Sequence, residues 1–540
     1  MPRDAARWYP PTQRVTPARG PTRSRPSPPL DRPIDAPQPP PHRNPIARLA
    51  NLRPGEGAKT AWAVAFFFFV LFGYFLIRPV REALGVERGM SELRWLFVGT
   101  LGLMLVANPI YAWIVQRWDR RVSLPLIYHF FVLNMLGFAA LLAFFPDVVG
   151  VATGRTFFVW LSVFNLFCTT LFWVLMADGF KLEQAKRLFP LIAVGGTLGA
   201  SAGSWIASTS AEALGHPGLI LAAAGGIELA VFCCWRLTRQ LDREATTLST
   251  LSATGALGSD ARCACCKGSL AGLTTGDSCA TCGELVTHTL DACADTHSTR
   301  DTDGEPSGVL DGLRAVIRSP YLLGVCGYIL LLTVFATFLY FAQARIVADA
   351  ADDTLGRTRL FAMIDLATQL TTLVLQVSLT ARLIRRIGVG WTLTILPLIA
   401  ALGFVALGLG EWLDSPVATT FIIITVVQAL YRAGKYAVAR PARETLFTVV
   451  TRDEKYKAKG FIDTFVYRGG DALGAGADSG LSFLVAKFPA LFGSVLGALA
   501  VTIAPLAILW AGLGLFLGAR QKRLAAAPLP TTPTTGTETP

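Results

Sequence analysis

The chain has 540 residues, of which 52% are hydrophobic and 16% are charged, and its formal net charge is +12. In a soluble protein so basic a balance would point to a nucleic-acid partner. Here the Lys and Arg residues lie in the tails and in the gaps between long apolar runs, where they would face an anionic inner leaflet. We therefore expect a membrane protein with no nucleic-acid partner.

The two ends of the chain differ from its middle. Residues 1–57 are rich in Pro and Arg with almost no apolar clustering, and residues 521–540 are rich in Pro and Thr. Such segments cannot bury enough surface to offset their ordering entropy, so we predict both to be disordered cytosolic tails. No cleavable signal peptide is expected, because the first apolar run begins near Ala61 and is too long for a signal sequence.

Between the tails, apolar runs recur at the length of a membrane span. A helix needs about 20 mostly apolar residues to cross a hydrocarbon core of roughly 30 Å. Runs of this length begin near Ala61, Leu93, Leu124, Thr156, Pro190, Gly218, Pro320, Thr358, Trp391, Val417, Phe461 and Leu491. Lys and Arg concentrate in alternate gaps, as in cytoplasmic loops. The pattern predicts twelve spans with both termini in the cytoplasm, and only the cationic gap after the first span departs from it.

Two halves of six spans each, at 58–240 and 316–520, resemble each other, and a long cytosolic loop at 241–315 separates them. Short basic loops follow the second and eighth spans. Charged loops followed by Gly-rich stretches, Gly195–Gly203 and Gly469–Gly476, lie after the fourth and tenth. These features predict an all-α membrane protein of the major-facilitator type, with a substrate site near the midplane between the halves. For the Gly-rich stretches we favour close helix packing over ligand contact.

Several spans carry ionisable residues, which are costly in hydrocarbon and usually face a cavity or the bundle interior. In span ten, Gln428, Arg432 and Lys435 share one helix face that carries no acid. At 1.5 Å per residue, Arg432 is expected roughly 20 Å from the outer end of its span. The other spans with such residues contribute Arg78, Arg81, Glu82, Asn165, Asp365, Asp463, Arg468 and Asp471.

So many cations at membrane depth favour a substrate with several negative charges, because phosphate oxygens bind guanidinium forks and Lys adds a point charge. We assign substrate binding to Arg432, Lys435, Arg468, Gln428 and Asn165. We assign gating or coupling to Arg78, Arg81, Glu82, Asp365, Asp463 and Asp471. The alternative is internal pairing, of Arg468 with Asp471 or Asp463 and of Arg81 with Glu82. Arg78 and Arg81 could also extend to the outer interface.

Longer motifs carry a family resemblance. They are the run Tyr74-Phe-Leu-Ile-Arg-Pro-Val-Arg-Glu and the segments 157–178, 183–189, 195–199, 440–450 and 454–471. In these the chain resembles the bacterial branch allied to the ATP/ADP translocases, over roughly residues 60–240 and 315–515. The resemblance implies nucleotide exchange across a bacterial inner membrane and does not fix the substrate. Proton-driven sugar and drug carriers match less well, because the loop after span two lacks the Gly and Asp of their motif.

Six of the ten cysteines lie in the loop between the halves. Cys263-x-x-Cys266 and Cys279-x-x-Cys282 have the spacing of a four-thiolate zinc site. The alternative is a reduced insert without metal. The resemblance does not imply zinc, and no cofactor is expected to be required.

The predicted function is secondary-active exchange of ATP/ADP-type nucleotides or related phosphorylated anions by alternating access. No enzymatic activity is expected, because the sequence has no Gly-x-x-x-x-Gly-Lys-Ser/Thr loop. Two alternatives stay open. One is a carrier of another solute, coupled to protons through Asp365 or Asp471. The other is a membrane sensor that binds a partner through the Cys-rich loop.

Overall fold

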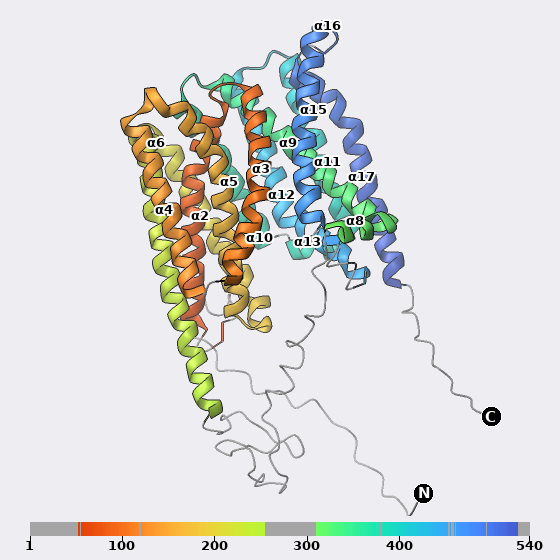
Figure 1. Ribbon diagram of the computed structural model, residues 1–540. Helices are drawn as coiled ribbons and strands as arrows, with labels where there is room; N and C mark the ends of the chain where they lie inside the picture. Colours follow the sequence, from red (N-terminus) through yellow and green to blue (C-terminus); the bar gives the residue numbers. More distant parts are fainter. Residues whose placement is uncertain are drawn as a thin grey trace, which may run out of the picture. The chain divides into compact units, whose positions relative to one another are not determined.

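The computed structural model of the chain describes residues 52–53 and 56–526, except 118–119, 254–308, 379, 452–453, 455–457, 460 and 493 (Figure 1). The four cysteines of the predicted zinc site and most of both predicted tails lie outside the described residues. Over the described ranges the structure is helical and contains no strand.

The N-terminal half consists of five helices, the last of which supplies two spans. They are α2 (Gly57–Val86), α3 (Met90–Arg117), α4 (Arg120–Phe144), α5 (Pro146–Gly179) and α6 (Leu182–Ala253). At Gly215 the backbone of α6 has a φ of 63°, in the left-handed region that glycine tolerates best. The chain reverses there, so the two parts of α6 run in opposite directions (Figure 1).

The C-terminal half is built of α8 (Val309–Arg318), α9 (Pro320–Ala350), α10 (Thr354–Ser378), α11 (Thr380–Trp412), α12 (Val417–Gly434), α13 (Arg440–Leu446), α15 (Tyr467–Lys487), α16 (Pro489–Phe492) and α17 (Val495–Ala526). Two π-helical turns interrupt the regular helices, at Lys435–Ala439 and Ile462–Val466. Such turns are rare and often lie at functional sites.

Ten of the described helices are long and apolar enough to cross a membrane. The apolar segment Glu183–Glu244 contains both parts of α6, and so counts as two crossings. The helix α15 is more polar and is not one of these ten, but it packs beside α9 and α3 within the bundle and is counted as the twelfth crossing. The predicted all-α fold of twelve membrane helices in two halves is thus confirmed.

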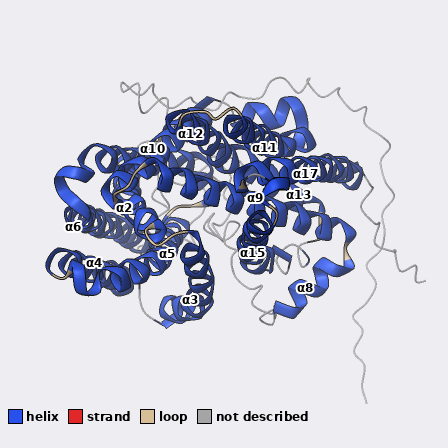
Figure 2. Cartoon of the chain, turned by 90° about the horizontal axis from the view of Figure 1, so that it is seen from above, coloured by secondary structure: helices blue, strands red, loops and turns tan. Residues whose placement is uncertain are grey.

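Each half has its own apolar core. Seen from above, α4 and α6 lie on one side of the bundle and α8 and α17 on the other (Figure 2). In the N-terminal half, Phe66, Phe131 and Phe164 are almost completely buried. In the C-terminal half, Tyr328 and Trp510 are completely buried, and their ring centroids lie 5.5 Å apart. A third, smaller cluster contains residues of both halves, among them Leu93, Phe158, Phe341, Val347 and Phe361. It lies where α3 and α5 meet α9 and α10.

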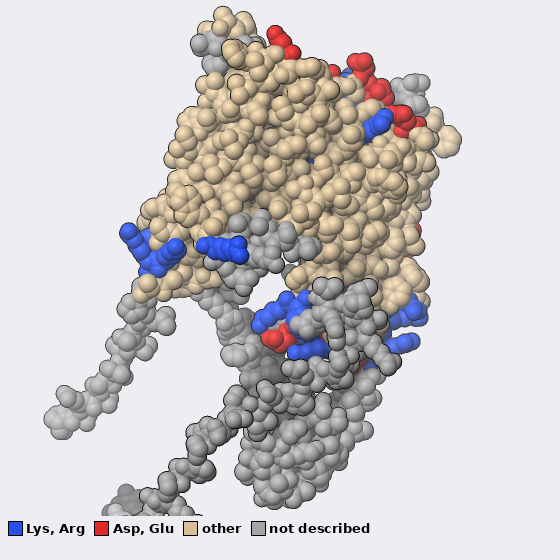
Figure 3. Space-filling view, turned by 180° about the vertical axis from the view of Figure 1, so that it is seen from behind, with Lys and Arg blue, Asp and Glu red and all other residues tan. Residues whose placement is uncertain are grey.

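Lys and Arg gather toward one end of the described helices, and most Asp and Glu on the same face lie toward the other (Figure 3). We call this end the basic end and define it by Lys181, Lys186, Arg187, Arg236, Arg239 and Arg520. We call the opposite end, which carries Glu92, Glu212 and Asp353, the far end.

The first Gly-rich stretch packs α6 against α2. A methyl group on Gly203 would lie 2.5 Å from the carbonyl oxygen of Phe72, and one on Gly199 would overlap the carbonyl oxygen of Phe68. In the second stretch, a methyl group on Gly470 or Gly474 would overlap the side chain of Thr333 or Thr337 on α9. These glycines let helix backbones approach closely, as small residues do in membrane bundles.

Replacing Gly199 with Ala is expected to destabilise the protein by about 1–3 kcal/mol, the usual cost of overpacking against atoms that cannot move. Gly225, also on α6, is the matched control, because a methyl group there meets nothing within 4 Å. Gly225→Ala should be neutral or slightly stabilising, since Ala favours a helix by about 1 kcal/mol over Gly. Thermal unfolding of the two variants in detergent measures the difference. Equal midpoints would contradict the close approach.

Candidate binding cavity

A cavity of about 830 Å³ lies between the two halves and receives side chains from α2, α5, α6, α9, α10 and α12. Aromatic side chains and amides make up much of its wall: Phe67, Tyr74, Phe75, Asn165, Trp173, Tyr340, Gln343, Gln369, Gln376, Gln428, Tyr431 and Tyr436. Its volume is in the range of small-molecule sites. In α5, α6 and α10 the lining residues lie in the half of the helix nearer the basic end, whereas in α9 they lie in the half nearer the far end.

Four cations line this cavity: Arg78, Arg432, Lys435 and Arg440. No Asp or Glu of the described chain lines it. Arg432 lies near the middle of the apolar segment Val417–Val449, and Lys435 begins the first π-helical turn. The surface of the cavity is therefore positive and also rich in aromatic rings, which suits an anion that carries a flat ring.

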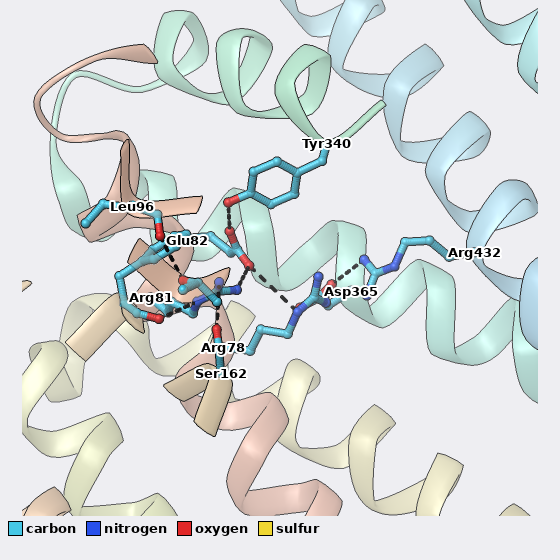
Figure 4. Close-up of polar contacts among 10 residues, drawn as sticks. Arg78, Arg81, Glu82, Leu96, Ser162, Tyr340, Asp365 and Arg432 are labelled. Atoms are coloured by element: carbon cyan, nitrogen blue, oxygen red, sulfur yellow. Dashed lines mark hydrogen bonds and ion pairs between the residues drawn. The ribbon is translucent and has the colours of Figure 1, made fainter. Parts of the chain in front are cut away.

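Behind the cavity wall, Asp365 of α10 joins two of these cations (Figure 4). Its Oδ1 accepts hydrogen bonds from Nη1 of Arg78 and, at 2.7 Å, from Nη1 of Arg432. Asp365 is 2% exposed, and its Oδ2 has no hydrogen-bond partner among the described residues. The face of α12 that carries Arg432 has no acid, as the sequence indicates, but Arg432 is neutralised all the same. The acid comes from another helix, and spacing along α12 cannot reveal it.

A second carboxylate continues the network. Glu82 of α2 lies 3.0 Å from Nη1 of Arg81 and 3.8 Å from Nε of Arg78, and it accepts a hydrogen bond from the hydroxyl of Tyr340 on α9. The guanidinium of Arg81 stacks 3.8 Å from the ring centre of Phe158. The predicted pairing of Arg81 with Glu82 is present. Three guanidiniums thus share two carboxylates at the centre of the bundle (Figure 4).

A smaller cavity of about 270 Å³ adjoins the first and shares Tyr74, Arg78, Asn165 and Tyr340 with it. Arg81, Glu82, Arg468 and Asp471 also line it. Nη1 of Arg468 lies 3.4 Å from Oδ2 of Asp471, so this predicted pairing is present as well.

The remaining predicted residues have different surroundings. Gln428 lines the large cavity, but its Nε2 donates to the carbonyl oxygen of Leu339 at 2.9 Å and so also holds α12 to α9. Asp463 lines neither cavity and lies 3.6 Å from Nη2 of Arg443. The structure thus brings together ten of the eleven predicted polar residues around the two cavities and leaves Asp463 apart.

The far end holds a further buried carboxylate, which the sequence interpretation missed. Asp478 of α15 is completely buried, and its Oδ2 lies 2.8 Å from Nη2 of Arg94 on α3 and 2.6 Å from Nη2 of Arg345 on α9. Arg359 and Glu212 form another bridge between the halves, 3.1 Å long. With the mixed apolar cluster these contacts join the two halves at the far end. The sequence does contain a signal for this residue, because Asp478 is an acid within a run of mostly small and apolar residues.

No family model matches this sequence, and no curated protein matches it either. Solved structures do resemble the fold. The POT family transporter PepTSo is 14% identical, with a TM-score of 0.54 over 86% of this chain and 98% of its own. The xylose transporter XylE from E. coli, in an inward-open conformation, is 14% identical, with a TM-score of 0.51 over 88% and 97%. A mutant of the nucleoside transporter NupG is 13% identical, with a TM-score of 0.50 over 86% and 98%.

At these identities the likeness shows the fold alone. The chain has the fold of major-facilitator transporters and is a multi-pass integral membrane protein. The translocase resemblance of the sequence remains a prediction.

Proposed function

We propose that the chain is a secondary transporter that exchanges nucleotides or related phosphorylated anions by alternating access. The observation that carries this proposal is the large cavity, which is lined by four cations and by no acid of the described residues. Arg78 and Arg432 share the single carboxylate of Asp365, so an excess of positive charge remains at the cavity. Excess charge at membrane depth is costly unless an anion or water compensates it. Guanidinium groups bind phosphate oxygens in pairs, and the aromatic walls offer surfaces on which a base can stack.

The basic end is proposed to face the cytoplasm, because Lys and Arg concentrate in cytoplasmic loops. The lining residues of α5, α6 and α10 lie nearer that end, and the contacts of Asp478 with Arg94 and Arg345 join the two halves at the other. The described conformation is then the inward-facing state of the transport cycle, and the protein is proposed to act in a bacterial inner membrane.

Uptake into proteoliposomes tests the proposal. Vesicles loaded with ADP should take up labelled ATP or ADP, and empty vesicles should take up much less, because exchange needs an anion on both sides. Labelled orthophosphate, with fewer charges to bind, is expected to be a poorer substrate. If the folded protein moves none of these anions under either loading, the proposal is wrong.

A second candidate is a proton-coupled carrier of another solute. The position of Asp365 favours it, since protonation of this buried carboxylate would release both Arg78 and Arg432. A pH gradient separates the two functions. Accumulation of a neutral solute in empty vesicles, driven by the gradient and lost in Asp365→Asn, would support proton coupling, whereas an exchanger needs a counter-substrate on the inside.

A membrane sensor is the third candidate, and it depends on the Cys-rich loop, which lies outside the described residues. Deletion of residues 250–305 should leave nucleotide exchange intact in a carrier. A zinc site at Cys263, Cys266, Cys279 and Cys282 would add one tightly held zinc ion to the full-length protein, which the deletion removes. Loss of uptake in a folded deletion variant would instead favour the sensor.

A further inference from the structure

A second concave site lies at the basic end, away from the cavities between the halves. It has a volume of about 730 Å³ and lies between the first turns of α2 and the second part of α6. Its lining residues are Ala58, Trp62, Arg236, Arg239, Gln240, Arg243 and Glu244. None of them lines the large or the small cavity, and nothing in the transport cycle requires them.

The three arginines recur at i, i+3 and i+7, which places them on one face of α6. All three are exposed. The guanidinium of Arg236 lies 5.2 Å from the ring centre of Trp62, and that of Arg239 lies 3.9 Å from the ring centre of Trp235. Stacking on indole rings fixes a guanidinium in place and leaves its N–H groups free to bind oxygen.

The site has an excess of positive charge. Its one acidic lining residue, Glu244, is neutralised by Lys59 at 2.8 Å. Among the described residues no carboxylate forms an ion pair with Arg236 or Arg239. The arrangement is built to bind an anion that the chain itself does not supply.

The level of the site along α6 indicates where that anion comes from. The second part of α6 starts at Pro217, and Arg236 follows about 29 Å further along the helix at 1.5 Å per residue, close to the thickness of a hydrocarbon core. Phe232 and Trp235 are 49% and 39% exposed next to the arginines. Trp side chains such as that of Trp235 are enriched at the level of the lipid headgroups.

We propose that this site binds the phosphate headgroup of an anionic phospholipid. Arg236, Arg239 and Arg243 bind the phosphate oxygens, and the acyl chains lie along the exposed apolar face formed by Leu229, Phe232 and Trp235. Basic pockets between membrane helices on the cytoplasmic side suit such headgroups. The site is separate from the proposed exchange activity and does not depend on it.

The test uses the full-length protein, purified in neutral detergent and stripped of lipid. Phosphatidylglycerol should raise the thermal midpoint in a saturable way, and phosphatidylcholine should not. R239Q should raise the half-saturating lipid concentration about fivefold, and R236Q/R239Q/R243Q roughly 100-fold, since each arginine near the surface contributes about 1 kcal/mol. R520Q/K522Q/R523Q removes the same charge from exposed positions of α17 at the basic end and should bind like wild type.

Three results would overturn the proposal. Equal stabilisation by phosphatidylcholine would mean that no phosphate anion is recognised. Equal weakening in the α17 variant would mean diffuse attraction rather than a site. Full stabilisation by soluble glycerol phosphate at the same concentration would mean a site for free anions and not for lipid. Should the triple α6 variant fail to fold, R239Q alone decides between these outcomes.

Discussion

Arg432→Gln is expected to weaken the binding of a nucleoside triphosphate by roughly 1.5–3 kcal/mol, the scale of one charge-assisted hydrogen bond. The substitution keeps polarity and removes the guanidinium fork from the cavity wall. Asp365 would keep Arg78 as its partner, so the variant leaves one cation for one carboxylate and no buried acid unpaired. The loss should shrink from ATP to ADP to orthophosphate, because fewer phosphate oxygens remain to be bound.

Equilibrium binding of the three anions to purified protein measures this series. Arg359→Gln is the matched control, since Arg359 pairs with Glu212 outside both cavities. Its affinities should equal those of wild type. Equal affinities of wild type and Arg432→Gln for every anion, with both proteins folded, would remove Arg432 from the binding site.

Asp365→Asn is expected to destabilise the protein by about 3–5 kcal/mol, the usual cost of breaking a buried ion pair by removing one partner. Arg432 would then lose the carboxylate with which it pairs, and Arg78 would keep only Glu82, 3.8 Å away. A phosphorylated anion could take the place of the lost carboxylate, so ATP should raise the thermal midpoint more in this variant than in wild type.

The double variant Asp365→Asn/Arg432→Gln supplies the control, because it removes one cation together with the acid. It should be more stable than Asp365→Asn alone, which is the sign of coupling expected for residues in one network. An Asp365→Asn protein as stable as wild type, with no larger effect of ATP, would mean that Asp365 does not neutralise the arginines.

The fold was largely predictable from the sequence because membrane spans are a local property. Length and hydropathy define each span, and the starts expected near Ala61, Pro320 and Val417 lie close to the starts of α2, α9 and α12. The approach of α6 to α2 also follows from local composition, since glycines at Gly195–Gly203 leave room for a neighbouring backbone. The membrane span at α15 was harder to predict, because its polar residues lower its hydropathy.

The candidate site was predictable only within single helices. Gln428, Arg432 and Lys435 do line one cavity, as their spacing on one helix face indicates. The partner of Arg432 is 67 residues away in the chain, and no spacing rule connects two helices. The same limit hid the contact of Arg94 with Asp478, residues 384 positions apart. Which acid neutralises which base is decided by packing between helices.

Three of the buried carboxylates have one feature in common that bears on how the bundle could move. Asp365 and Asp478 each pair with an arginine of their own half, Arg432 and Arg345, and with one of the other half, Arg78 and Arg94. Glu82 likewise pairs with Arg81 of its own half and with Tyr340 of the other. If the two halves rocked as rigid bodies, each acid would lose the partner in the other half and keep the partner in its own half. If the halves parted, none of these three acids would be left without a partner, whereas Arg94 would lose its ion pair with Asp478.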